Sequence, residues 1–487
     1  MSSESPYRMT LSLNVLNHLG LNLYSNVPSV LSEVVANAWD ADAENVWITI
    51  DPTTDHEKIV IQDNGHGMTQ QEVNERYLLV GYQRREHGSE RTKKFNRLPM
   101  GRKGIGKLSL FSIARTIKVR TVKEGQRSAF RMNLDDIKQK IGGQEAGTYE
   151  PNPLPTDDID FERGTQIVIT DPKKRIHQAA SALRTRLARR FSIIGSAHHF
   201  AVFIDDEEIS HVDRDYYHKV QYLWTFGDEN SLYEKLCAKA ESIEKLYGLL
   251  DSGDEIRGWV GTAKESGQKL QDRHGDNLNR IVVLVRGKVA QEDILEEFGE
   301  TGIFSSYLIG EVHADFLDAD DQDDIATSSR QRIIEDDPRY EVLKAFIGKT
   351  LKKIQNEWTR LRNEEGSKRA LEIPAINDWF KELNPDLRKD AKSLFGKINT
   401  LTETPDKKRE LLRSGVLAFE HLNHKGKLKE LDTVSEEKPG SGSTYFCRSG
   451  RHRGNFANSS RKCNSWIDVE KYLIRGIHAK AFSWSVV

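Results

Sequence analysis

The chain lacks the features that mark secreted and membrane-spanning proteins. Its 487 residues include three cysteines (Cys237, Cys447 and Cys463), too few for a disulfide framework, and none of them forms a zinc-type pair. No stretch reaches the run of about 18 apolar residues that a membrane span needs. The N-terminus has no basic segment followed by an apolar block, so we expect no secretory signal. These absences favour a protein of the reducing cytoplasm with no membrane partner.

An excess of charge of one sign is also lacking. The formal net charge is −2, with 37% hydrophobic and 30% charged residues. Whole-chain charge therefore argues neither for nor against a nucleic-acid partner, which only a local basic patch could indicate. The length predicts two to four domains with substantial cores.

The sequence pattern divides the chain into four parts. Residues 1–175 alternate helical segments with the strand-like stretches "VWITID", "KIVIQDNG", "TIKVRTV" and "GTQIVITD", which predicts an α/β sandwich. Residues 176–345 predict a second α/β domain, with strands in "HFAVFIDDEEI", "RIVVLVRGKVA" and "SSYLIGEVHADFLD" and a helical insert in "SLYEKLCAKAESIEKLYGLLDSG". Residues 346–437 are helical and charged, and we expect them to pack or dimerise rather than catalyse.

The last part, residues 438–487, has no helical or strand period. Beyond Pro439 it carries eight Lys or Arg against two acids. One hypothesis is a basic arm for nucleic acid, and another is a poorly structured terminus. A third is an altered reading frame, since codons for "CRSGRHRGNFA", shifted by one base, can encode the acidic, helix-like "ADLDDIEATL".

Polar residues at helical spacing raise the question of function. In the helical stretch that begins "LSEVVANAWDADA", Glu33, Asn37 and Asp40 lie three and four residues apart and so share one side of the helix. Such a row alone is usually a solvated face. Further motifs follow in order, however, and change its interpretation.

The second motif is "DNGHGM", directly after the strand "KIVI". Asp63 at a strand end can accept a hydrogen bond from an exocyclic amine. Gly65 and Gly67 allow a sharp turn and leave room for a flat ring. The same letters are also ordinary turn chemistry.

The third motif is "GRKGIGKLSLFSIA", with glycines at 101, 104 and 106 before an apolar helix. Bare backbone N–H groups at a helix start suit phosphate, and Lys107 adds a positive charge. The preceding segment, 69–100, could be a mobile lid. A fourth signal, weak alone, is Thr165 in "GTQIVI", which could reinforce the acid at position 63.

Together these motifs resemble those of the Bergerat-fold ATPases, also called GHKL, over about residues 10–175. The family includes gyrase B, MutL, the large heat-shock chaperones, MORC proteins and histidine kinases. The resemblance implies an α+β chain: a Bergerat-fold α/β sandwich, an S5-like α/β transducer domain and a helical C-terminal region. It is closest to prokaryotic MORC-like or chaperone-like members.

The resemblance also implies a role for each motif residue. Glu33 matches the general base that activates water, and Asn37 matches the ligand of Mg²⁺. Asp40 matches the acid that supports the helix and the nucleotide pocket, and Asp63 matches the adenine-binding acid. The remaining matches are the adenine-site neighbours Gly65, Gly67 and Thr165 and the phosphate-covering lid residues Gly104, Gly106 and Lys107.

A cation from the second domain is expected at the γ-phosphate. The segment Ser305 to Ile333 resembles the chaperone middle domain, in which an arginine reaches that phosphate, and the match falls on Arg330. Lys288 in "VRGKVA" resembles the lysine that MutL and gyrase supply. We place Arg330 first and expect Lys288 to be an ordinary surface cation.

The family implies an ATP-hydrolysing, Mg²⁺-dependent switch that dimerises when ATP closes the lid. Its partner could be DNA, in a restriction or phage-defence setting, or a protein. The alternative is an ATP-sensing scaffold with little hydrolysis. A histidine kinase fits poorly, because kinases of that type generally lack an acid at the position of Glu33.

Overall fold

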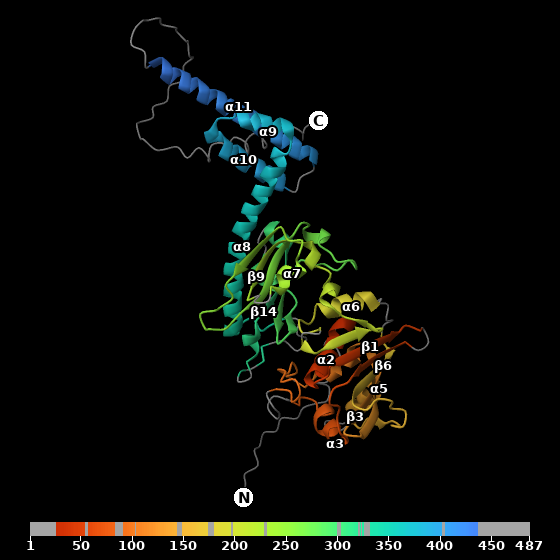
Figure 1. Ribbon diagram of the computed structural model, residues 1–487. Helices are drawn as coiled ribbons and strands as arrows, with labels where there is room; N and C mark the ends of the chain where they lie inside the picture. The colour runs from red at the N-terminus through yellow and green to blue at the C-terminus, as the bar shows by residue number, and fades with distance from the viewer. Residues whose placement is uncertain are drawn as a thin grey trace.

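The computed structural model describes residues 26–53, 57–82, 91–102, 104–143, 149–173, 180–195, 198–227, 231–299, 303–319, 322, 324–325, 332–401 and 405–436. Arg330, the segment before residue 26 and the tail 438–487 lie outside these residues. The described chain is elongated: one mixed α/β region is followed by a second sheet, and a long helix carries a helical bundle at the far end (Figure 1). This α+β architecture agrees with the predicted fold class.

The first sheet has the strand order β5-β4-β3-β6-β2-β1-β7-β8. The four strands predicted from the sequence, β1, β2, β3 and β6, lie side by side in antiparallel pairs. The pairing of β2 with β6 places Asp63 opposite Thr165. The strands are β1 (Asn45–Asp51), β2 (Lys58–Asp63), β3 (Ala114–Lys123), β4 (Gln126–Asn133), β5 (Asn152–Pro153), β6 (Gly164–Pro172), β7 (Ala201–Ile204) and β8 (Glu207–Glu208).

One predicted strand belongs to a different sheet than expected. The stretch "HFAVFIDDEEI" was assigned to the second domain, but its strand β7 pairs in parallel with β1 of the first sheet. The predicted domain boundary at residue 175 therefore falls between strands of a single sheet. Val202 and Ile204 of β7 are buried in the same core as Val46 and Ile48 of β1, and this apolar packing explains the pairing.

Helices pack with the first sheet into one core. Val30, Leu31 and Val35 of α2 are fully buried there, together with Leu183 and Leu187 of α6. Burial of such side chains contributes roughly 1.5–3 kcal/mol each. The helical elements of this region are α2 (Val27–Asp40), α3 (Gln70–Glu72), the π-helical turn Val73–Tyr77, the 3-10 helix Gly106–Ser112, α5 (Leu134–Gly143) and α6 (Ala180–Ala188).

The second sheet has the order β10-β9-β11-β14-β12-β13. The predicted helical insert is largely wrong: its sequence forms only the short helix α7 (Leu232–Leu236) and then strand β10. The pairing of β10 with β9 satisfies its backbone and overrides the helical pattern. The strands are β9 (Val220–Phe226), β10 (Ser242–Leu246), β11 (Arg257–Ala263), β12 (Ile281–Val285), β13 (Lys288–Gln291) and β14 (Leu308–His313).

The C-terminal region is helical, as predicted. Helix α8 (Pro338–Leu371) buries Tyr340, Ile347 and Ile354 in the core of the second sheet, and its far end meets the bundle (Figure 1). The bundle helices are α9 (Pro374–Glu382), α10 (Pro385–Thr400) and α11 (Pro405–Glu436). Among the described helices, none is long and apolar enough to cross a membrane.

Candidate active site

Helix α2 presents two polar side chains from an otherwise buried surface. Asn26 caps its start by accepting a hydrogen bond from the Ser29 amide at 2.9 Å. From Pro28 to Asp40, every side chain of this helix is buried except Glu33 and Asn37. These two are one turn apart and therefore lie on one face. A helix that is closed on all other sides leaves a carboxylate and an amide together at one opening.

Asp40 faces the glycine-rich loop, by which we mean residues 99–102 and 104–106, rather than the opening beside Glu33 and Asn37. Its two carboxylate oxygens accept hydrogen bonds from the amides of Met100 (2.8 Å) and Gly101 (2.9 Å). A Cβ atom on Gly101 would lie only 2.9 Å from the same carboxylate, so glycine permits this approach. Asp40 thus ties the C-terminal turn of α2 to the loop.

Asp63 lies buried where β2 ends. Its Oδ1 accepts a hydrogen bond from the Gly65 amide at 2.8 Å, and the backbone of Thr165 also donates to this carboxyl. Burial raises the pKa of Asp63 from 3.8 to about 6, although both hydrogen bonds oppose the shift. A buried carboxylate whose charge is this costly is well suited to a ligand that donates a hydrogen bond to it.

Thr121 is a site residue that the sequence did not reveal. Its hydroxyl accepts from the Met68 amide at 2.9 Å, donates to the Gly164 carbonyl at 3.1 Å and lies 3.2 Å from the Thr165 hydroxyl. It therefore joins the turn after Asp63 to strand β6. Nothing in "TIKVRTV" distinguishes this threonine from a neighbour, because only the register of β3 against β6 brings the two hydroxyls together.

The glycines after Asp63 are required by the protein backbone itself. A Cβ on Gly65 would lie 2.7 Å from the Ala41 carbonyl oxygen. Gly67 has φ +64°, and a Cβ there would lie 2.0 Å from the Val122 carbonyl oxygen. The turn is thus packed between the end of α2 and β3, and side chains at these positions would push the two apart.

The glycine-rich loop approaches Glu33, but its lysine points elsewhere. A Cβ on Gly106 would lie 2.9 Å from Glu33 Oε2, and Gly104 has φ +64°. Lys107 Nζ donates to the carbonyl oxygens of Leu79 (2.5 Å) and Arg76 (3.3 Å). Burial lowers the pKa of Lys107 to about 8. The predicted lid residues therefore separate: Gly106 adjoins the opening, while Lys107 binds the end of the preceding helical turn.

Lys288 reaches Glu33 from the second sheet. Its Nζ donates to Glu33 Oε1 at 2.7 Å, and the two side chains are only 3% and 14% exposed. The expectation that Lys288 is a surface cation is wrong. The lysine follows a two-residue turn between β12 and β13, in which Arg286 and Gly287 both have positive φ (50° and 78°). Arg330, expected to be the leading cation, lies outside the described residues.

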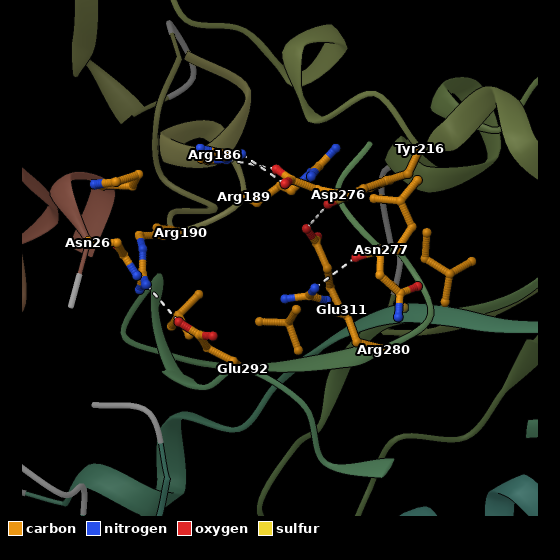
Figure 2. A pocket seen from close by; sticks show the side chains of 16 residues that line it. Asn26, Arg186, Arg189, Arg190, Tyr216, Asp276, Asn277, Arg280, Glu292 and Glu311 are labelled. Atoms are coloured by element: carbon orange, nitrogen blue, oxygen red, sulfur yellow. Dashed lines mark hydrogen bonds and ion pairs between the residues drawn. The ribbon is translucent and has the colours of Figure 1, made fainter. Parts of the chain in front are cut away.

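A separate cavity of about 290 Å³ lies between the start of α2, the residues after α6 and the second sheet (Figure 2). Four arginines line it, and acids pair with three of them: Arg186 with Asp276 and Arg190 with Glu292, each at 2.7 Å, and Arg189 with Asp272 at 2.9 Å. Val289, the neighbour of Lys288, also lines this cavity. The cavity therefore adjoins the strand that carries Lys288 and does not include the predicted nucleotide-site residues.

Sequence comparison shows which protein family the residues of this site resemble. Residues 24–165 match the family described as "Histidine kinase-, DNA gyrase B-, and HSP90-like ATPase". These residues are therefore similar to that ATPase family. The match begins just before α2 and ends at Thr165, so it includes Glu33, Asn37 and Asp63 but not Lys288. The GHKL resemblance is confirmed.

Individual relatives include a protein named as a restriction enzyme and several chaperones. The chain is 40% identical over 367 residues to the "Putative type II restriction enzyme HgiDII" of Herpetosiphon aurantiacus, an alignment covering 74% of this chain and 58% of that protein. It is 32% identical over 152 residues to the chaperone protein HtpG of Francisella tularensis subsp. novicida, covering 26% and 23%, respectively. HtpG of Rickettsia typhi is 26% identical over 175 residues, covering 32% of this chain and 26% of that protein. The chain thus spans little more than half of the first relative and about a quarter of the chaperones.

Proposed function

We propose that this protein is an ATP-hydrolysing, Mg²⁺-dependent switch. The proposal rests on one observation. Glu33 and Asn37 are the two side chains between Pro28 and Asp40 of α2 that are not buried, and both the glycine-rich loop and Lys288 of the second sheet lie next to Glu33. A general base, a metal ligand and a cation beside one opening are the parts that phosphoryl-group hydrolysis requires.

Each residue of the proposed site has a role that suits the chemistry of its side chain. Asp63 accepts a hydrogen bond from the adenine amine, while Thr165 and Thr121 hold the turn beside it. The Asn37 side-chain oxygen would hold Mg²⁺, which would neutralise charge on the triphosphate. Glu33 orients and deprotonates the attacking water.

Lys288 would make the availability of Glu33 as a base depend on bound nucleotide. Its ammonium donates a hydrogen bond to Glu33 in the structure. A γ-phosphate carries more negative charge than a carboxylate and competes for the same ammonium. Transfer of Lys288 to the phosphate would release a carboxylate oxygen of Glu33 for water, so the base becomes available only when substrate is present.

For the whole protein we propose an ATP-dependent homodimer, working in the cytoplasm, that clamps a macromolecular partner. Similarity to a protein named as a restriction enzyme favours DNA in a defence or restriction setting. The second candidate, an ATP-sensing scaffold or chaperone-like module with little hydrolysis, is favoured by the similarity to HtpG. It is also favoured by the ion pair that holds Glu33.

The first prediction separates these two candidates. Glu33→Gln keeps the shape of the side chain but removes the base, so ATP binding should persist while phosphate release falls by about 10²-fold or more. The measurements are titration with a fluorescent ATP analogue and a phosphate-release assay. Glu208→Gln, at an exposed acid of β8, should match wild type. Equal turnover in wild type and Glu33→Gln would leave the scaffold as the better description.

A further inference from the structure

Asp318 lies between two arginines that come from different parts of the site. Its Oδ1 pairs with Arg102 Nη1 at 2.5 Å, and its Oδ2 lies 3.2 Å from Arg286 Nε. Its backbone oxygen accepts from Arg286 Nη2 at 2.5 Å. Arg102 and Asp318 are each 13% exposed and Arg286 is 5% exposed, so water screens these pairs weakly.

Both arginines belong to segments that meet at Glu33. Arg102 is part of the glycine-rich loop, next to Gly101, whose amide Asp40 holds. Arg286 is the first residue of the two-residue turn that presents Lys288. Arg286 also donates to the Pro99 carbonyl at 3.4 Å, so the turn contacts the loop directly as well.

This arrangement makes the loop and the hairpin one mechanical unit. Arg286 also donates its backbone N–H to Asp315 Oδ1 at 2.6 Å, which anchors the turn to the short 3-10 helix Asp315–Asp318. That helix is held to the loop by Arg102. A shift of the loop therefore moves Asp318 and, through Arg286, the turn that places Lys288.

We propose that Asp318 is a positioning residue for ATP hydrolysis, which transmits the position of the glycine-rich loop to Lys288 and so to Glu33. This inference rests on the proposed ATPase function. Asp318 acts on Lys288 through Arg286. It extends the site by a residue whose role lies in coupling rather than in binding nucleotide.

Kinetics give the first test. Asp318→Ala should lower kcat by about tenfold to a hundredfold, because small misplacements of catalytic groups are costly, while KM for ATP changes less than about threefold. Arg102→Gln, which leaves the Arg286–Asp318 pair intact, should lower kcat in the same direction and decides the matter if Asp318→Ala does not fold. Glu296→Gln, at the exposed pair with Arg332, is the control and should retain wild-type kcat.

A second test needs no ATP. Lys288 is 3% exposed in its pair with Glu33, so an amine-acetylating reagent should modify it slowly. In nucleotide-free Asp318→Ala and Arg102→Gln, acetylation of Lys288, quantified by peptide mass spectrometry, should rise several-fold, while Glu296→Gln stays at the wild-type level. Unchanged labelling or unchanged kcat overturns the coupling role of Asp318. A wild-type protein that does not bind ATP would refute the proposed function instead, and labelling would still test the link.

Discussion

Asp40 and Asp63 are two buried carboxylates of the proposed nucleotide site, and their surroundings differ. Both oxygens of Asp40 accept amide hydrogen bonds from the glycine-rich loop, so this residue is committed to holding the loop. Asp63 instead accepts from the turn and strand beside it, and desolvation raises its pKa to about 6. Two acids that look equivalent in the sequence thus hold different segments: Asp40 holds the glycine-rich loop, and Asp63 accepts from the turn after β2 and from strand β6.

The second prediction follows from the pKa of Asp63, which is 3.8 in an unfolded chain and about 6 when folded. A raised pKa favours folding below pH 3.8, and this stabilisation is lost as pH rises through about 6. At pH 8 the ionised side chain therefore costs about 3 kcal/mol. Asp63→Asn should raise the free energy of unfolding at pH 8 by a similar amount, change it little at pH 4, and weaken ATP binding.

Urea denaturation at both pH values checks the stability of this variant. Asp158→Asn, at a largely exposed acid paired with Arg120, is the control. A stability difference that does not depend on pH would contradict the assignment of the raised pKa to this residue.

Single residues also show how far sequence analysis reaches. The spacing of Glu33 and Asn37 on one helix face could be predicted because it depends on local geometry alone. Lys288 was misjudged as a surface cation because its burial depends on a partner 255 positions away in the sequence. Thr121 was missed for the same reason. Residues placed by local geometry are predictable, whereas those placed by packing between distant segments are not.

At the scale of elements, the β12–β13 hairpin does most to complete the site. Its turn needs positive φ at both residues, which glycine adopts readily at position 287. A Cβ on Gly287 would lie 2.3 Å from Ile193 Cγ2, so the turn is packed closely against the segment between α6 and strand β7 of the first sheet. The backbone of β13 also bonds to that segment, with the Val289 amide donating to the Arg190 carbonyl at 3.0 Å. The hairpin is therefore held to both regions.

The third prediction distinguishes the two candidate cations. Lys288→Met retains most of the apolar stem but removes the charge, and turnover should fall by about 10²-fold, the usual effect of deleting one electrostatic contact to a transition state. Arg330→Met should have a smaller effect. Phosphate release is measured for both, with Lys269→Met, at an exposed position, as the control. A greater loss in Arg330→Met than in Lys288→Met would reverse our assignment.

Strand prediction succeeded where the pattern was strong and failed where pairing decided the outcome. Buried, β-branched runs such as "KIVIQD" were identified correctly, and β2 indeed lies between β1 and β6. The stretch that forms β10 has two apolar residues, Ile243 and Leu246, three positions apart, a spacing that also suits a helix. Its extended form depends on the neighbouring strand β9, which the sequence does not reveal.

At the scale of the whole molecule, the fold class could be predicted but the allocation of strands to sheets could not. The motif order indicated the ATPase fold because the family shares it. Strand β7, however, crosses the predicted boundary at residue 175 to join β1. Domain boundaries are hard to infer when the connecting segment itself contributes a strand to the earlier sheet.

The fourth prediction concerns the partner. If DNA is the molecule clamped, ATP turnover should rise several-fold on addition of linear double-stranded DNA at about 50 mM salt. The stimulation should weaken steeply by about 200 mM salt, because phosphate contacts release counterions. Glu33→Gln with DNA, which should stay inactive, is the control for contaminating ATPases. Turnover that is indifferent to DNA at both salt concentrations would argue for a protein partner.

Helix α8 would transmit movements of such a cycle from the second sheet to the distant helical bundle. Its 34 residues extend about 51 Å, and buried residues from Tyr340 to Trp358 pack it in the core of the second sheet, while its last turns continue to the helical bundle. A rigid-body rotation of about 15° at that sheet would displace the opposite end by roughly 13 Å. The helix would thus act as a lever arm. A small rearrangement around Lys288 would become a displacement of the helical bundle comparable to the width of a macromolecule's groove.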